Sequence, residues 1–224
     1  MLIVHHLGVS QSERVVWLCE ELEIPYDLRI HKRDPFFSPP SIKTLHPIGA
    51  APIIQDGDLT LAESAACIDY IIHKHGNGRL ALGPTHKDYA AYLYWFHFSN
   101  GSLQPGFMRL MSLQRAGCDQ SGDSYKFVAR RVDGYVEHVE ARLGSATWLA
   151  GDEFTAADIM TVFSFTTARA FAPYDLSPYP NILAYLQRVA KRPAYRRAHE
   201  KGDPGLPYML DGPPPKSFAE MLKQ

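Results

Sequence analysis

Residues 46–72 read HPIGAAPIIQDGDLTLAESAACIDYII, and this stretch decides the fold. Two short apolar runs, 52–55 and 58–61, flank Asp56-Gly57, a pair that readily takes the positive φ values of a tight hairpin turn. The second run leads into Glu63-Ser64 and then into an amphipathic helix. Because a helix start leaves backbone N–H groups free and carries partial positive charge, it favours a ligand carboxylate. The alternative is an ordinary hairpin and helix with no ligand.

The residues before this stretch predict a βαβ unit. Residues 2–7 form a short buried strand, a helix starts at Ser10-Gln11-Ser12-Glu13, and residues 26–30 form a second strand. Two strands joined in this way are parallel, with a right-handed crossover. A short helix is expected at 41–45. Pro52 begins the hairpin and cannot donate a ladder hydrogen bond, so it marks an edge, a bulge or a cis bond.

From residue 87 onward, helical patterns replace strand patterns. Residues 87–100 are apolar on nearly every face, which is typical of a helix that is buried, lines a pocket or forms a subunit interface. Gly101 and Pro105 are expected to bend it. Thr155 is predicted to cap a helix, with Asp158 reaching back to its N–H. Further helices are predicted at 125–143, 156–172, 181–191 and 193–201. The Gly- and Pro-rich tail is expected to be surface-bound or loosely ordered.

Composition argues against several classes of protein. The 224 residues are 46% hydrophobic and 21% charged, as in a globular protein with a sizeable core. A formal net charge of −1 without a basic stripe gives nucleic-acid binding little electrostatic support. No apolar run reaches the roughly 18 residues of a membrane span. The N-terminus resembles that of a mature protein without a signal peptide, and a cytoplasmic location is expected.

The cysteines and histidines do not predict a disulfide framework or a metal site. Cys19, Cys67 and Cys118 are widely spaced and odd in number, so each is interpreted as a small buried apolar residue. His5 and His6 would point to opposite faces of a strand and could not share a metal ion.

Taken together, these patterns resemble the cytosolic glutathione transferases over residues 1–201. The resemblance rests on HPIGAAPII, AESAACIDYI and TAADI. Three further segments are similar to a bacterial and fungal branch that includes the yeast transferase of the endoplasmic reticulum: HHLGVSQSERVVWLCEEL, KRDPFFSPPSIKTLHPIG and NGSLQPGFM. The resemblance to this family implies an α/β thioredoxin-like N-terminal domain and an all-α C-terminal domain, usually in a homodimer. The implied ranges are 1–77 for the first domain, 78–86 for the linker, 87–205 for the helical domain and 206–224 for the tail.

The resemblance also implies a glutathione site in the first domain. Pro52 would be a cis-proline, and the backbone of Ala51 would pair with the cysteinyl part of glutathione. Glu63 would accept from the α-ammonium, and Ser64 would hold the α-carboxylate at the helix start. Ala50 stands where many relatives have a basic or amide residue, so the ligand of the glycyl carboxylate stays open. The candidates are Lys32, Arg33, Lys43 and His46.

Two serines are candidates for activating the glutathione sulfur. Aligned on Arg14, Ser10 falls on the catalytic position of the serine-type transferases, and Ser12 is next in line. A hydroxyl donor and helix-end N–H groups would stabilise the thiolate. For both serines the alternative is simple capping of the helix.

The implied function is that of a detoxifying enzyme. It would use glutathione as co-substrate, need no metal, and transfer the sulfur to a small hydrophobic electrophile or reduce a hydroperoxide. Thiol–disulfide exchange would require glutathione to supply both sulfurs, because residues 8–13 contain no cysteine. A glutathione-binding or ligand-carrier module without turnover is the alternative from another class. The electrophile pocket is expected in the helical domain, with core packing as the alternative role of each residue. Its candidates are Tyr94, Phe98, Phe107 and Met108.

Overall fold

The structure, a computed structural model, describes residues 1–223 and consists of two compact units. The first unit combines residues 1–82 with residues 189–207. The second combines residues 83–188 with the chain from Tyr208 onward. This division differs from the implied domain limits, because a late helix packs with the first unit. Within residues 1–223, no helix is both long enough and apolar enough to cross a membrane.

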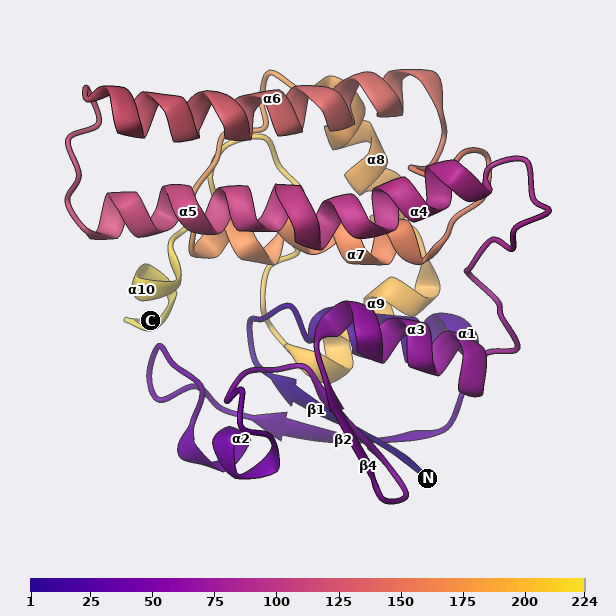
Figure 1. Cartoon of the computed structure of the whole chain (residues 1–224). Helices are drawn as coiled ribbons and strands as arrows, with labels where there is room; N and C mark the ends of the chain where they lie inside the picture. Colours follow the sequence, from indigo (N-terminus) through magenta and orange to yellow (C-terminus); the bar gives the residue numbers. More distant parts are fainter. Residues whose placement is uncertain (224) are drawn as a thin grey trace. The chain divides into compact units, whose positions relative to one another are not determined.

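A four-stranded mixed sheet with the order β2-β1-β3-β4 forms the centre of the first unit (Figure 1). Its strands are β1 (Leu2–Leu7), β2 (Tyr26–His31), β3 (Ile53–Asp56) and β4 (Leu59–Ala62). β1 and β2 are parallel, whereas β3 is antiparallel to both β1 and β4. The predicted βαβ unit and hairpin are therefore confirmed, with the crossover made by α1 (Glu13–Leu22).

Two further helices of this unit pack on the sheet. In α2 (Pro40–Leu45), Ile42 packs against Ile53 and Ala62. α3 (Ser64–Lys74) packs on α1 and on the hairpin, and it buries Cys67 together with its isoleucines. Cys19 of α1 is also buried, as predicted. Cys118 is exposed, so its predicted burial was wrong, because it lies in the polar turn that follows α5 (Gln104–Arg115).

The late helix of the first unit is α9 (Pro193–Gly202), which packs along α1. The buried carboxylate of Glu20 accepts hydrogen bonds from Arg197 and Lys201. The ring of Trp17 meets that of Tyr195 edge-on at 4.8 Å between centroids. These contacts explain why residues 193–201, expected in the helical domain, belong to the first unit.

The second unit is helical, as expected, and in Figure 1 α4 and α5 follow one another in one row, with α6 and α7 running alongside that row. Its helices besides α5 are α4 (Tyr89–Phe98), α6 (Asp123–Ser145), α7 (Ala156–Phe165), α8 (Pro180–Ala190, whose last two residues belong to the first unit) and α10 (Phe218–Met221). A π-helical turn, Ser99–Leu103, joins α4 to α5 at the predicted bend. Pro105 has no N–H to donate to the carbonyl four residues earlier, so the regular ladder is interrupted there.

The predicted cap of α7 is confirmed. The Thr155 hydroxyl accepts the N–H of Ala157 at 3.3 Å, and Asp158 Oδ2 accepts the N–H of Thr155 at 2.9 Å. The helix predicted at 156–172 nevertheless ends at Phe165. Thr166 has φ −119° and ψ −104°, which is not a helical conformation, and a 3₁₀ turn at Thr167–Ala170 follows.

The tail packs on the second unit, so of the two alternatives expected for it, surface-bound or loosely ordered, the structure agrees with the first. Arg169 is buried, and it donates to backbone carbonyls of the tail and of the loop between the 3₁₀ turn and α8. Those acceptors include Tyr174, Asp211, Gly212 and Pro213. Phe218 of α10 is also buried, with its ring 4.9 Å from that of Phe171.

Candidate active site

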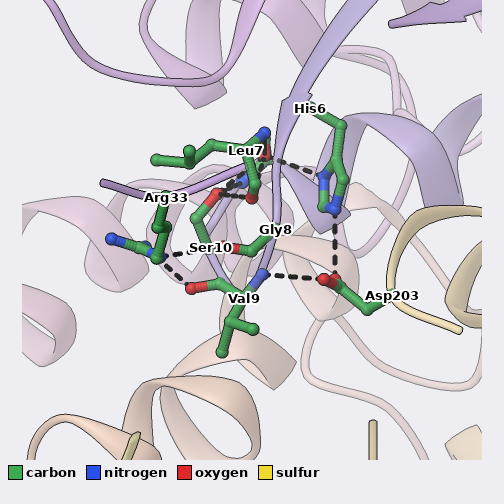
Figure 2. A network of polar contacts seen from close by, with 8 residues as sticks. His6, Leu7, Gly8, Val9, Ser10, Arg33 and Asp203 are labelled. Carbon is green, nitrogen blue, oxygen red and sulfur yellow. Dashed lines mark hydrogen bonds and ion pairs between the residues drawn. The ribbon is translucent and has the colours of Figure 1, made fainter. Parts of the chain in front are cut away.

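The turn between β1 and α1 places Ser10 and Ser12 side by side, with their Oγ atoms 2.7 Å apart. Ser10 Oγ donates to the Leu7 carbonyl at 2.7 Å and accepts the N–H of Ser12 at 3.2 Å (Figure 2). Ser12 Oγ accepts the N–H of Leu7 at 3.0 Å. Although Ser12 precedes α1, its hydroxyl makes no capping hydrogen bond to that helix. Helix capping therefore does not account for Ser12.

The same turn contains a strained residue. Val9 has φ 53°, in the left-handed region that a β-branched side chain rarely adopts. Two contacts hold it there: its N–H donates to Asp203 Oδ1 at 2.7 Å, and its carbonyl accepts from Arg33 at 2.8 Å (Figure 2). Arg33 also donates to the Gly8 carbonyl at 2.9 Å. Such a conformation persists only where the surrounding structure fixes it, so the position of Ser10 depends on these partners.

A chain of hydrogen bonds connects this turn with the hairpin and α3. The peptide bond between Ala51 and Pro52 is cis, and both residues are buried. Gln11 donates to the Ala51 carbonyl at 3.3 Å. Arg14 donates to the side chain of Gln11 at 3.2 Å and to the Ser64 hydroxyl at 3.1 Å. Burial lowers the pKa of the Arg14 guanidinium to about 9, which still leaves it a cation at neutral pH.

The residues predicted for the γ-glutamyl end lie at the start of α3. Glu63 is exposed and has φ 72°, an uncommon conformation of the kind that clusters at ligand sites. Ser64 is the first residue of α3 and is buried. His46 is half-buried at the end of α2, and its Nδ1 accepts the N–H of Ile48 at 3.3 Å. The first unit therefore contains all eight residues predicted for the sulfur and for glutathione. They are Ser10, Ser12, Arg33, His46, Ala51, Pro52, Glu63 and Ser64.

The four residues predicted for the electrophile pocket lie in the second unit at three different places. Tyr94 and Phe98 line a hollow of about 710 Å³ between α4 and α6. Phe107 is buried, and its ring lies 6.4 Å from that of Phe165. Met108 lines another hollow, on α5. Phe107 is thus packed in the interior of this unit, and the pocket with its four residues stays a prediction.

Sequence analysis did not single out two residues next to the serines. His6 is fully buried, with Nδ1 2.9 Å from Ser12 Oγ and Nε2 3.1 Å from Asp203 Oδ2. The sequence presents His6 only as a possible metal ligand, and within residues 1–223 no group of three or more potential ligands gathers. Because 197 residues separate His6 from Asp203, no local pattern could have revealed the pair.

Comparisons with known proteins identify the family. The family model for the glutathione S-transferase N-terminal domain matches residues 10–74, and the model for the C-terminal domain matches residues 100–193. The chain is 32% identical over 218 residues to glutathione S-transferase 3 of Schizosaccharomyces pombe, with 90% of this chain and 88% of that relative covered. The chain belongs to the glutathione S-transferase family.

Other relatives agree with this assignment. Glutathione S-transferase 1 of Saccharomyces cerevisiae is 27% identical over 222 residues, with 88% of this chain and 94% of the relative covered. Among solved structures, a glutathione S-transferase from Actinobacillus pleuropneumoniae has a TM-score of 0.82 at 30% identity, covering 94% of this chain and 99% of that one. The chain is an enzyme of glutathione transfer, and these relatives do not favour a module without turnover.

Proposed function

We propose that the first unit binds glutathione with its sulfur at Ser10, and that the sulfur, held as a thiolate, attacks a small hydrophobic electrophile or a hydroperoxide. The Ser10–Ser12 pair carries this proposal. It lies at the start of α1, and hydrogen bonds through Gln11 and Arg14 link that start to the cis-Pro52 hairpin and to Ser64. A hydroxyl donor and two helix starts thus belong to one connected network, as a bound anion requires.

Ser10 is the better candidate for the contact with sulfur. Ser12 is 0% exposed and is enclosed by Leu7 and His6, whereas Ser10 is 7% exposed. Lowering a thiol pKa by about two pH units, from roughly 8.5, requires about 2.7 kcal/mol of preference for the anion. A hydrogen bond to a charged group contributes about 1.5–3 kcal/mol, and a helix start adds about 0.3–1 kcal/mol. Together, Ser10 and the start of α1 contribute about 1.8–4 kcal/mol, a range that includes the required preference.

For glutathione itself, the proposed contacts are those of the family resemblance. The backbone of Ala51 pairs with the cysteinyl part beside Pro52, and Glu63 and Ser64 hold the γ-glutamyl end. Arg33 and His46 are the candidates for the glycyl carboxylate. Since Arg33 already donates to the carbonyls of Gly8, Val9 and Phe36, His46 is the better candidate of the two.

The experiment is a pH titration of thiolate absorbance in the glutathione complex of the wild type, Ser10→Ala and Ser12→Ala. We expect the bound thiol to titrate about two pH units below free glutathione, and to return toward the free value in Ser10→Ala with binding retained. An unshifted thiol in the wild type would contradict thiolate stabilisation. A shift that survives in Ser10→Ala and disappears in Ser12→Ala would assign the sulfur contact to Ser12.

We also propose that the enzyme is a cytoplasmic homodimer that needs no metal. Support for the dimer comes from family membership and from the aromatic surface of α4, where Tyr94 is half exposed and Leu93 is also exposed. Sedimentation at micromolar concentration tests the dimer, and a monomer would contradict it. Conjugation activity that is unchanged by a chelator is the expected result for metal independence.

A further inference from the structure

We propose that His6, paired with Asp203, receives the proton that the glutathione thiol loses, and that this proton passes through the hydroxyls of Ser10 and Ser12. The inference rests on the proposed contact between Ser10 and the sulfur. Its basis is an unbroken chain of short contacts: 2.7 Å from Ser10 Oγ to Ser12 Oγ, 2.9 Å on to His6 Nδ1, and 3.1 Å from His6 Nε2 to Asp203 Oδ2. Figure 2 shows His6 and Asp203 on the side of this turn away from Arg33.

The carboxylate of Asp203 decides which nitrogen of His6 carries the proton. A carboxylate only accepts hydrogen bonds, so Nε2 of His6 must be the protonated nitrogen that faces it. In the neutral imidazole, Nδ1 then has a free lone pair, and its neighbour at 2.9 Å is the Ser12 hydroxyl. The Ser12 proton is therefore donated to His6, which is the arrangement that a proton acceptor requires.

Counting the hydroxyl protons shows what a further proton would do. With neutral His6, Ser12 donates to Nδ1, and Ser10 donates inward, to the Leu7 carbonyl or to Ser12. When Nδ1 carries a proton, it donates to Ser12, and Ser12 in turn donates to Ser10. Ser10 then accepts from Ser12, and its own hydroxyl proton can be donated to a bound sulfur. One proton on His6 thus corresponds to one hydroxyl donor available for a thiolate.

The transfer is balanced within this chain of groups. The S–H bond of glutathione breaks, and its proton goes to Ser10 Oγ as the former Ser10 proton moves to Ser12 Oγ. The former Ser12 proton forms the Nδ1–H bond of His6. The products are a thiolate that accepts a hydrogen bond from Ser10 and an imidazolium paired with the Asp203 carboxylate. Neither His6 nor Asp203 touches the sulfur, so both are positioning residues.

The groups around His6 favour the added charge. Burial acts to raise the pKa of Asp203, but hydrogen bonds from His6 and Val9 outweigh it and hold that pKa below its usual value. Burial lowers the pKa of His31 and that of His199, so neither adds a second positive charge at neutral pH. The cation Arg33 interacts with Asp203 and donates to the backbone carbonyls of Gly8 and Val9.

The end of α9 adds to this preference. A Cβ atom on Gly202 would lie 3.1 Å from Nε2 of His6, so the imidazole lies directly against the last turn of that helix. The C-terminus of a helix carries partial negative charge and stabilises an imidazolium.

The experiment counts protons. Glutathione is added to the enzyme in weakly buffered solution between about pH 7 and 8, where a free thiol is mostly protonated. Thiolate absorbance gives the thiolate formed, and an indicator gives the protons released. If His6 keeps the proton, the wild type releases well below one proton per thiolate.

Two variants interrupt the transfer without removing Ser10. Ser12→Ala breaks the chain of hydroxyls. In Asp203→Asn the amide oxygen can still accept the N–H of Val9, but the amide N–H₂ group then faces Nε2 of His6. The imidazole proton therefore moves to Nδ1, so that Nδ1 cannot accept the proton from Ser12. We expect both variants to release about one proton per thiolate, and in Ser12→Ala, which loses the hydroxyl that links Ser10 to His6, we expect the bound thiol pKa to rise by about one pH unit. Asp56→Asn is the matched control, because Asp56 pairs with His75 at 2.7 Å in the same unit and has no contact with either serine.

The outcomes separate the two proposals. If thiolate forms in the wild type and is lost in Ser10→Ala, but one full proton is released in the wild type, in both variants and in the control, the role of His6 is overturned and that of Ser10 stands. If the wild type forms no thiolate, or Ser10→Ala forms it unchanged, the proposed function fails and the transfer through Ser10 fails with it. A low proton release that returns to one only in Ser12→Ala and Asp203→Asn supports the inference.

Discussion

Polar side chains inside the first unit form hydrogen bonds with one another, and their protonation states are therefore linked. His5 illustrates this beside the serine turn. Its Nδ1 lies 3.0 Å from Nε2 of His31, and its Nε2 lies 3.0 Å from the side-chain oxygen of Gln55. Two imidazoles that share one hydrogen bond cannot both be protonated, because two N–H groups would then face each other.

At this scale we predict that acid destabilises the enzyme through His31. Burial, and after it His5 and His6, lowers the pKa of His31. The unfolded chain therefore binds more protons than the folded one as the pH falls below the ordinary histidine value of about 6.5. The stability that neutral His31 contributes is thus fully present above that pH, and it is lost as the pH falls further. Urea unfolding from about pH 8 to 5.5 should show a smaller loss for His31→Gln, and equal pH profiles would contradict the prediction.

At the scale of single elements, the start of α7 depends on one buried carboxylate. Besides Thr155, Asp158 accepts from the N–H of Leu149 at 3.0 Å and from the hydroxyl of Tyr185 at 3.1 Å. Burial raises the pKa of Asp158 to about 6, against the effect of these hydrogen bonds. The cap thus fixes the helix start and also ties it to the preceding loop and to α8.

We therefore predict unequal costs at the two positions of this cap. Thr155→Ala should lower the free energy of unfolding by about 1 kcal/mol, the ordinary value of a helix cap. Asp158→Asn should cost about 1–3 kcal/mol, because an amide N–H₂ would then face other donors in a buried site. Glu220→Gln is the matched control, since it changes the equivalent but exposed cap of α10. Urea midpoints measure all three, and an equal effect in the control would contradict the role of burial.

The elements also show how much of the fold could be predicted from sequence. The Asp56-Gly57 turn and the Thr155 cap depend on a few neighbouring residues, so both were predicted correctly. The pairing of His6 with Asp203 depends on where two distant segments meet in space, and neither residue type is unusual in its own segment. From sequence, the candidate site could thus be located as far as the hairpin, the serines and the start of α3, and the roles of these residues stay predictions. The buried pair behind the serines, His6 and Asp203, could be found only from the structure.

At the scale of the whole molecule, the first unit is discontinuous in sequence, and we predict that a fragment of residues 1–82 does not fold. Without α9, Glu20 loses Arg197 and Lys201, and the face of α1 that α9 covers is exposed to water. Trp17 would lose the ring of Tyr195. Far-UV circular dichroism should show little structure in the fragment. A peptide of residues 189–207 should restore part of it, and a folded fragment without that peptide would contradict the prediction.

This discontinuity has a consequence for the growing chain on the ribosome. Domains commonly fold in order from the N-terminus as they are synthesised. Here the residues of β1 and α1 emerge first, yet Asp203 is made only after the whole of residues 83–188. Both units are therefore completed only near the end of synthesis, the first with residues 189–207 and the second with the chain from Tyr208. The nascent enzyme acquires the partner that holds Val9, and with it a fixed serine turn, at a late stage of translation.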